Sequence, residues 1–173
     1  ILQYKPKTMR IWVENELKPG ISSKDLILYI ISKISASGAT GYFVEYAGPA
    51  IEALSMEARM TICNMSIEMG ARGGLIAPDH VTFDYLEGRP EAPEGKKWEE
   101  AVKHWKTLHT DDNAVFDEEL KIDAAHIDPM VTFGTNPGMG VTVNDTIPLT
   151  TDLAESSRTS FKKSLDYMGL SEG

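Results

Sequence analysis

The order of elements in this 173-residue sequence predicts an α/β domain, with helices packed on a mostly parallel or mixed sheet. Two observations carry the prediction. Short apolar segments typical of strands recur at residues 8–17, 42–46 and 74–77. Between them lie two longer segments, 22–38 and 55–70, whose apolar residues recur with the period of a helix. The chain is long enough for one domain with a core of ordinary size.

The first of these helices has a recognisable start and stop. Ser22 or Ser23 is a good N-cap, and Gly38 is the residue at which we expect the helix to end. After the second strand, Pro49 suits the first turn of a short helix over residues 50–54. The apolar side chains of the first helix repeat along one face and predict a buried stripe of Leu26, Ile27, Ile30, Ile31 and Ile34.

The helix predicted over residues 55–70 is the centre of the domain. Ser55 is a good N-cap, Glu57 adds negative charge to the first turn, and Gly70 offers a stop. One apolar flank consists of Met56 and of three residues that we expect to be buried, Met60, Cys63 and Ile67. A second apolar flank consists of Ala58, Ile62, Met65 and Met69. A narrow polar ridge between the flanks consists of Glu57, Thr61, Asn64 and Glu68.

The polar ridge contains the candidate functional residues. Apolar side chains border it on both sides, which is not the pattern of a solvated face, so we expect it to point into a cleft or an interface. An unpaired carboxylate in such a place costs roughly several kcal/mol. Asn64 and Glu68 are one helical turn apart and are therefore our candidates for a catalytic role. The alternative is that Glu68 is an ordinary ion-paired glutamate on a half-buried helix.

Composition excludes several classes of function. The net charge is −9 and there is no basic run, which argues against binding to nucleic acid or to an anionic membrane. No apolar run is long enough to cross a bilayer and no secretory signal is present, so we expect a cytoplasmic protein. Cys63 is the only cysteine, which excludes an internal disulfide. We expect it to behave as a small buried hydrophobe.

Histidines and acidic residues give no convincing metal site. His104 and His109 lack a third ligand at a suitable spacing, and the turn at 111–113 lacks the further acidic residue of a calcium loop. Asp79 and His80 follow a predicted strand, where open α/β sheets place ligands. A lone loop histidine is usually just solvated, and we assign His80 no role.

The second half of the chain is less regular. We expect a single domain over residues 1–150, with an insertion at about 88–113, followed by a linker and a final helix over residues 151–173. Residues 133–140, FGTNPGMG, are glycine-rich but lack the lysine of a phosphate loop. The remaining predicted elements are a helix at 96–108, a strand at 116–125, a polar linker at 151–160 and a helix at 161–168.

Several segments resemble a known family. SMEARMTICNMSIEMGARGGLIAPD at 55–79 and TGYFVEYAGPAIEAL at 40–54 are similar to the aconitase superfamily, and most of all to its isopropylmalate dehydratase branch, large subunit. VTFGTNPG at 131–138 and VNDTIP at 143–148 extend the resemblance through nearly the whole chain. The resemblance implies a three-layer α/β/α aconitase-type domain. It also implies that Asn64 and Glu68 are the active-site asparagine and glutamate of the family's CNM-x-x-E motif.

The resemblance implies a reaction and its partners. In that branch, a hydro-lyase of leucine biosynthesis interconverts 2- and 3-isopropylmalate by dehydration and rehydration, using a 4Fe–4S cluster, the other large-subunit domains and a separate small subunit. The substrate would be a hydroxy diacid. A cubane cluster needs at least three thiolates and this chain has one, so we expect an internal piece of a longer subunit that binds no cluster and is inactive alone. The alternatives are a homoaconitase or methylmalate dehydratase, or a non-catalytic interaction module.

Overall fold

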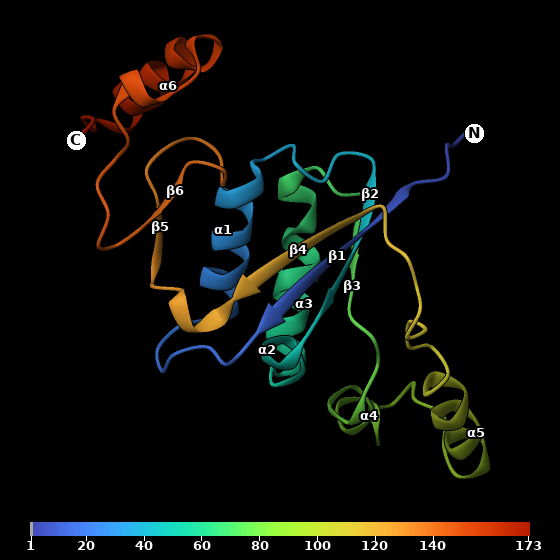
Figure 1. The fold of residues 1–173 in the computed structure, drawn as a ribbon. Helices are drawn as coiled ribbons and strands as arrows, with labels where there is room; N and C mark the ends of the chain where they lie inside the picture. Colours follow the sequence, from blue (N-terminus) through green and yellow to red (C-terminus); the bar gives the residue numbers. More distant parts are fainter. Residues whose placement is uncertain (1) are drawn as a thin grey trace.

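Four strands form one parallel sheet in the order β3-β2-β1-β4 in the computed structural model, which describes residues 2–173 (Figure 1). The strands are β1 (Lys7–Glu14), β2 (Tyr42–Ala47), β3 (Gly73–Leu75) and β4 (Glu118–Asp123). The predicted α/β class and its mostly parallel sheet are confirmed. The strands differ from the predicted ranges mainly at their ends, where sequence patterns are least informative.

The central strand, β1, has two different faces. Met9, Ile11 and Val13 alternate along it and are at most 4% exposed, so they form one wall of the core. Ile11 lies opposite Tyr46 of β2, which is buried on the same side. Trp12 points to the other face and is half-buried, as its position in the alternation predicts.

Helices α1 (Ser23–Ile34) and α3 (Met56–Met65) pack against each other on one face of the sheet (Figure 1). Ser22 caps α1 through a capping box, in which its hydroxyl accepts from the N–H of Asp25 and the Asp25 carboxylate accepts from the N–H of Ser22. The predicted stripe of α1 is buried except at its last residue, Ile34, which is half-buried. The helix stops there because Ser35 adopts a positive φ of 74°, before the predicted stop.

The central helix is shorter than the sequence predicts. Ser55 is its N-cap and accepts from the N–H of Ala58 at 3.3 Å, as expected. The α-helix ends at Met65, and a 3₁₀ turn, η1 (Ser66–Met69), continues the chain. Gly70 then ends the turn with a φ of 81°, a left-handed cap that glycine adopts without strain.

The expectation that Met60, Cys63 and Ile67 are buried is wrong. Met60 is 40% exposed, Ile67 is 65% exposed and Cys63 is half-buried. The opposite side of α3 and η1 faces the core, and its buried residues are Arg59, Ile62, Ser66 and Met69. Arg59 and Ser66 belong to neither of the two predicted apolar flanks, and they are buried because Asp79 and Tyr46, from other elements, bond to them.

The second face of the sheet lies under the segment 106–117. The Thr110 hydroxyl donates to the Glu45 carboxylate on β2, and the Arg10 guanidinium of β1 lies 4.7 Å from the ring centre of Phe116. In this chain α1 and α3 therefore form one helical layer on the sheet, and the irregular segment 106–117 lies over the other face.

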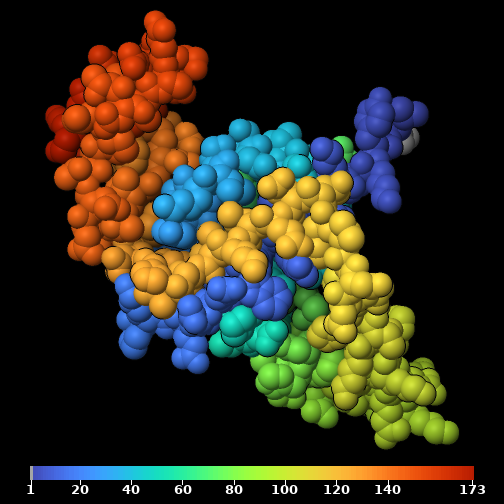
Figure 2. Space-filling model, viewed as in Figure 1, coloured from blue at the N-terminus to red at the C-terminus, as the bar shows by residue number. Residues whose placement is uncertain are grey.

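The remaining elements form two projections at opposite ends of the molecule (Figure 2). The first carries α4 (His80–Leu86) and α5 (Lys96–Trp105), where Phe83 stacks on Trp105 at a ring distance of 6.0 Å. The second contains the C-terminal elements. The other elements are α2 (Pro49–Glu52), η2 (Ala124–His126), β5 (Met130–Thr132), β6 (Gly140–Thr142), η3 (Thr150–Asp152) and α6 (Glu155–Met168).

The C-terminal projection has its own small core. Phe133, Phe161 and Leu165 are buried together, with the two phenylalanine rings edge to face at 5.8 Å. The antiparallel pair β5–β6 contacts α1 and so joins this core to the sheet domain. Helix α6 begins at Glu155, within the predicted linker. Within residues 2–173, no helix combines the length and the apolar character that crossing a membrane requires.

Candidate functional site

A cavity of about 550 Å³ lies at the carboxyl ends of the parallel strands. Side chains from β1 and β2, the β3–α4 connection and the segment after α5 line it. The sequence predicts that the strand ends open on one side near Asp79 and His80, and both residues line this cavity. The prediction of a hollow at this edge of the sheet is therefore confirmed.

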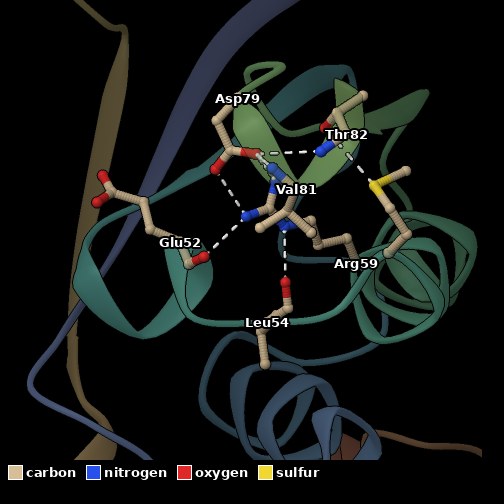
Figure 3. A network of polar contacts seen from close by, with 7 residues as sticks. Glu52, Leu54, Arg59, Asp79, Val81 and Thr82 are labelled. Carbon is tan, nitrogen blue, oxygen red and sulfur yellow. Dashed lines mark hydrogen bonds and ion pairs between the residues drawn. The ribbon is translucent and has the colours of Figure 1, made fainter. Parts of the chain in front are cut away.

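Arg59 donates four hydrogen bonds at the cavity (Figure 3). It is 3% exposed, and its Nη1 and Nη2 atoms donate to the two carboxylate oxygens of Asp79, each at 2.7 Å. Nη2 also donates to the carbonyl of Glu52 at 2.8 Å, and Nε donates to the carbonyl of Leu54 at 3.1 Å. The guanidinium therefore ties the α2–α3 connection to the residue that starts α4.

Asp79 serves two elements at once. Its carboxylate pairs with Arg59 and also caps α4, accepting from the N–H groups of Val81 at 3.1 Å and Thr82 at 3.3 Å (Figure 3). Burial acts to raise the pKa of Asp79, but the hydrogen bonds and positive charge of Arg59 outweigh it and hold the pKa below its usual range. The carboxylate is thus charged at neutral pH and fully engaged in structure.

The two histidines of the cavity do not assemble a metal site. His80 and His109 both line the cavity, and both are exposed. Across residues 2–173, no group of three or more histidine, cysteine, aspartate or glutamate side chains is arranged to hold a metal ion. His80 is left without an assigned role.

Asn64 and Glu68 lie at the other end of the sheet. Helix α3 starts after the carboxyl end of β2 and runs back toward the start of the strands. The carbonyl of Met69 accepts from the N–H of Ala39 at 2.9 Å, just before β2 begins at Tyr42. Glu68 is therefore at the amino end of the parallel sheet, away from the Arg59–Asp79 pair.

The candidate residues are free to meet another surface. Asn64 and Glu68 are both exposed, and neither lines the carboxyl-end cavity. No ion pair within residues 2–173 engages Glu68, so the alternative of an ordinary ion-paired glutamate is not realised among the described residues. The catalytic assignment of the two residues stays a prediction.

An apolar groove of about 260 Å³ runs between α3 and β3, and neither Asn64 nor Glu68 lines it. Met60, Cys63 and Leu75 line it, and Leu75 is 56% exposed on the edge strand of the sheet. Burial raises the pKa of the Cys63 thiol, so at neutral pH the thiol is protonated. These properties suit a packing residue and not a thiolate ligand.

The Arg59–Asp79 ion pair could not be found from the faces of one helix, because its two partners come from different elements. Arg59 lies one turn before Ile62 of the second apolar flank, and its partner Asp79 comes 20 residues later. A signal does exist in the sequence, because an arginine beside an apolar flank must meet a carboxylate or carbonyls if it is buried with that flank. It predicts a partner without saying which carboxylate it is.

A 4Fe–4S cluster does not fit the residues present in this chain. Cys63 is the sole cysteine, its thiol is protonated, and the groove around it supplies methionine, leucine and glycine. A cubane cluster needs at least three thiolates. The side chains of these 173 residues therefore do not form the ligand set of such a group.

The parallel α/β sheet, the SMEAR–CNMSIE helix and the following Asp79 cap define a domain of the aconitase class. A match to the Aconitase family (aconitate hydratase) covers residues 1–173, and the chain belongs to that family. The expected family is therefore confirmed.

More particular relatives are the large subunits of 3-isopropylmalate dehydratase. This chain is 58% identical over 173 residues to that of Bacteroides thetaiotaomicron, 59% identical to that of Bacteroides fragilis and 60% identical to that of Cytophaga hutchinsonii. All of this chain is covered in each case, but it spans only 37% of the length of each relative.

Proposed function

We propose that this chain is a domain of the large subunit of a 3-isopropylmalate dehydratase, a hydro-lyase that interconverts 2- and 3-isopropylmalate. The observation that carries the proposal is 58 to 60% identity over the whole chain to proteins of that name. The relatives named above carry neither of the two other activities considered, homoaconitase and methylmalate dehydratase, in their names. Because the chain spans 37% of these relatives, the activity belongs to the longer protein.

Dehydration breaks a carbon–oxygen bond and a carbon–hydrogen bond on the neighbouring carbon, and releases water. The carbon-bound proton goes to a base that lies outside this chain, in the longer protein, and the departing hydroxyl takes up another proton to leave as water. Rehydration adds water back to the alkene by the same steps in reverse, with the hydroxyl on the neighbouring carbon. We assign Glu68 to hold and transfer a proton at that oxygen through its carboxyl group. The Asn64 side-chain amide orients the same oxygen by hydrogen bonding. Both side chains are exposed and form no side-chain hydrogen bond or ion pair within residues 2–173, so the cleft or interface expected around them would be formed with another part of the longer protein.

The surface around Asn64 and Glu68 is suited to burial in the longer subunit. Met60, Ile67 and Leu75, on α3, η1 and β3, are between 40% and 65% exposed, and a covering domain would remove this apolar surface from water. The other large-subunit domains are the proposed cover. A 4Fe–4S cluster would then be held by those domains, and a small subunit would complete the site.

We propose that residues 1–150 form the aconitase-like domain, with an insertion at about 88–113, and that residues 151–173 lead to the rest of the subunit. The isolated chain should have no dehydratase activity and bind no cluster. We place the full heterodimer in the cytoplasm, acting on a hydroxy diacid in leucine biosynthesis.

Purified full-length large subunit, combined with its small subunit under anaerobic conditions, provides the test. Absorbance of the alkene intermediate is followed with 2-isopropylmalate, homocitrate and 2-methylmalate supplied separately. The proposal predicts the highest kcat/KM for 2-isopropylmalate. A preference for either other acid would assign a different hydro-lyase, and no turnover of any of the three would favour the non-catalytic alternative. The 173-residue chain alone is the negative control.

A further inference from the structure

We propose that Tyr46 and Ser66 are positioning residues that set the angle between Asn64 and Glu68. The inference rests on the proposed function, because it concerns the two residues assigned to the reaction. Ser66 lies between them in the sequence, at the point where α3 changes into the 3₁₀ turn η1.

The change of helix type is visible in the hydrogen bonds of Ser66. In an uninterrupted α-helix its N–H would donate to the carbonyl of Ile62, four residues earlier. Here that N–H donates to the carbonyl of Cys63, three residues earlier. The Ile62 carbonyl, on a residue with no exposed surface, takes the Ser66 hydroxyl as its donor at 3.1 Å. The hydroxyl thus replaces the backbone donor that the tighter turn removes.

Tyr46 holds the Ser66 hydroxyl in that orientation. The two hydroxyl oxygens are 2.8 Å apart, and the two residues are 1% and 0% exposed. Since Ser66 donates its proton to Ile62, Tyr46 must donate to Ser66. Burial raises the pKa of Tyr46, so the phenol keeps the proton that this bond needs. The result is a directed chain of hydrogen bonds from strand β2 to the end of α3.

Gly74 leaves the space that this arrangement needs. A Cβ atom at Gly74 would collide with the Ser66 hydroxyl and lie 3.1 Å from both the Cα of Cys63 and the ring of Tyr46. Strand β3 therefore approaches α3 closely at the same point where the helix tightens. Three separate elements meet at the turn between the two candidate catalytic residues.

The tightening changes where Glu68 points. A 3₁₀ turn rotates by about 120° per residue where an α-helix rotates by about 100°. Over the two steps from Ser66 to Glu68 this adds roughly 40° of rotation and about 1 Å of rise compared with a continuous α-helix. A displacement of about 1 Å at a reacting group can lower a rate by roughly 100-fold. The Tyr46–Ser66 bond is accordingly placed to affect turnover more than substrate binding.

The test uses Ser66→Ala and Tyr46→Phe in the full-length large subunit, assembled with its small subunit. Two matched controls come from α1. Ser32→Ala removes a serine hydroxyl that donates to the carbonyl of Tyr29 at 2.7 Å. Tyr29→Phe removes the phenol oxygen of a half-buried tyrosine. We expect each test variant to lower kcat at least ~10-fold with KM within about 3-fold of wild type. The double variant should be no slower than Ser66→Ala, because Tyr46 acts only through Ser66. The controls should keep both constants.

Thermal unfolding and a crystal structure of a variant distinguish a positioning role from a loss of folding. Thermal unfolding fixes an assay temperature at which every variant is folded. A variant that keeps kcat at that temperature, or that loses kcat and affinity equally, overturns the inference. A crystal structure of Ser66→Ala is the readout that does not need activity, and it should show the backbone N–H at position 66 bonded to the Ile62 carbonyl, with Glu68 rotated. An unchanged 3₁₀ turn also overturns the inference. If wild type turns over no substrate, the proposed function fails, while this structural result still decides whether the pair sets the turn.

Discussion

Replacing Arg59 by methionine removes the guanidinium and keeps most of the length of the side chain. Arg59 is 3% exposed and donates four hydrogen bonds, two to the Asp79 carboxylate and one each to the carbonyls of Glu52 and Leu54. After Arg59→Met, the Asp79 carboxylate is left partly buried without its counter-ion, and two carbonyls lose their donors. Breaking a buried ion pair by removing one partner typically costs about 3–5 kcal/mol of unfolding free energy.

That cost predicts a large change in thermal unfolding. For a chain of this size, 1 kcal/mol corresponds to about 2–4 °C, so the melting temperature should fall by roughly 6–20 °C. The matched control is Lys18→Met, which breaks the Lys18–Asp128 pair, whose side chains are 46% and 37% exposed. Exposed pairs contribute about 0–1 kcal/mol, so the control should lower the melting temperature by only a few degrees. Equal losses for the two variants would refute the buried-clamp reasoning.

The same pair predicts a pH dependence. Because the pKa of Asp79 is lowered in the folded chain, its contribution is fully present above the ordinary aspartate pKa of the unfolded chain. The contribution is lost as the pH falls through the lower folded-state pKa. Urea unfolding of wild type and Arg59→Met at neutral and acidic pH should therefore show a gap in stability that narrows in acid. A gap that stays constant down to about pH 2 would contradict the charged state assigned to Asp79.

Three further predictions test other parts of the structure. Gly74→Ala should cost on the order of 1–3 kcal/mol of unfolding free energy, because the added methyl group overpacks against Ser66 and Cys63. Gly73→Ala should cost less, because its methyl group meets only the partly exposed ring of Phe43. Urea unfolding compares the two variants. Asp25→Ala should lower the unfolding free energy by about 1–2 kcal/mol in the same assay, because Asp25 closes the capping box and also accepts from the N–H of Met130 at 2.8 Å. An unchanged unfolding free energy would refute that role. Cys63, half-buried with a raised pKa, should react with iodoacetamide more slowly at about pH 8 than an unfolded thiol; an equal rate would contradict the placement.

Caps, strand faces and turns that are set by residues close together in the sequence were predictable. The caps at Ser22 and Ser55, the alternation of β1 and the left-handed end at Gly70 all depend on residues within a few positions of one another. The ends of α1 and α3 were not predictable. Their endings depend on a positive φ at Ser35 and on a hydroxyl–carbonyl bond at Ser66, neither of which has a distinctive local pattern.

The orientation of α3 could not be predicted because both of its flanks are apolar. The choice between them is made by Arg59 and Ser66, whose partners Asp79 and Tyr46 each lie 20 residues away in the sequence. Pairing such polar residues stabilises the side of the helix that contains them and leaves Met60 outside. The placement of Asn64 and Glu68 on an exposed surface follows from the same choice.

Kinetics of Glu68→Gln in the full-length dehydratase test the central claim most directly. The variant keeps the shape of the side chain and removes its ability to exchange a proton. Glu57→Gln, at an exposed position of the preceding helix α3, is the matched control. The account predicts that Glu68→Gln lowers kcat for 2-isopropylmalate by roughly 100-fold or more, with KM within about 3-fold of wild type, and that the control changes neither. An unchanged kcat, or an equal loss in kcat and in substrate affinity, would contradict it.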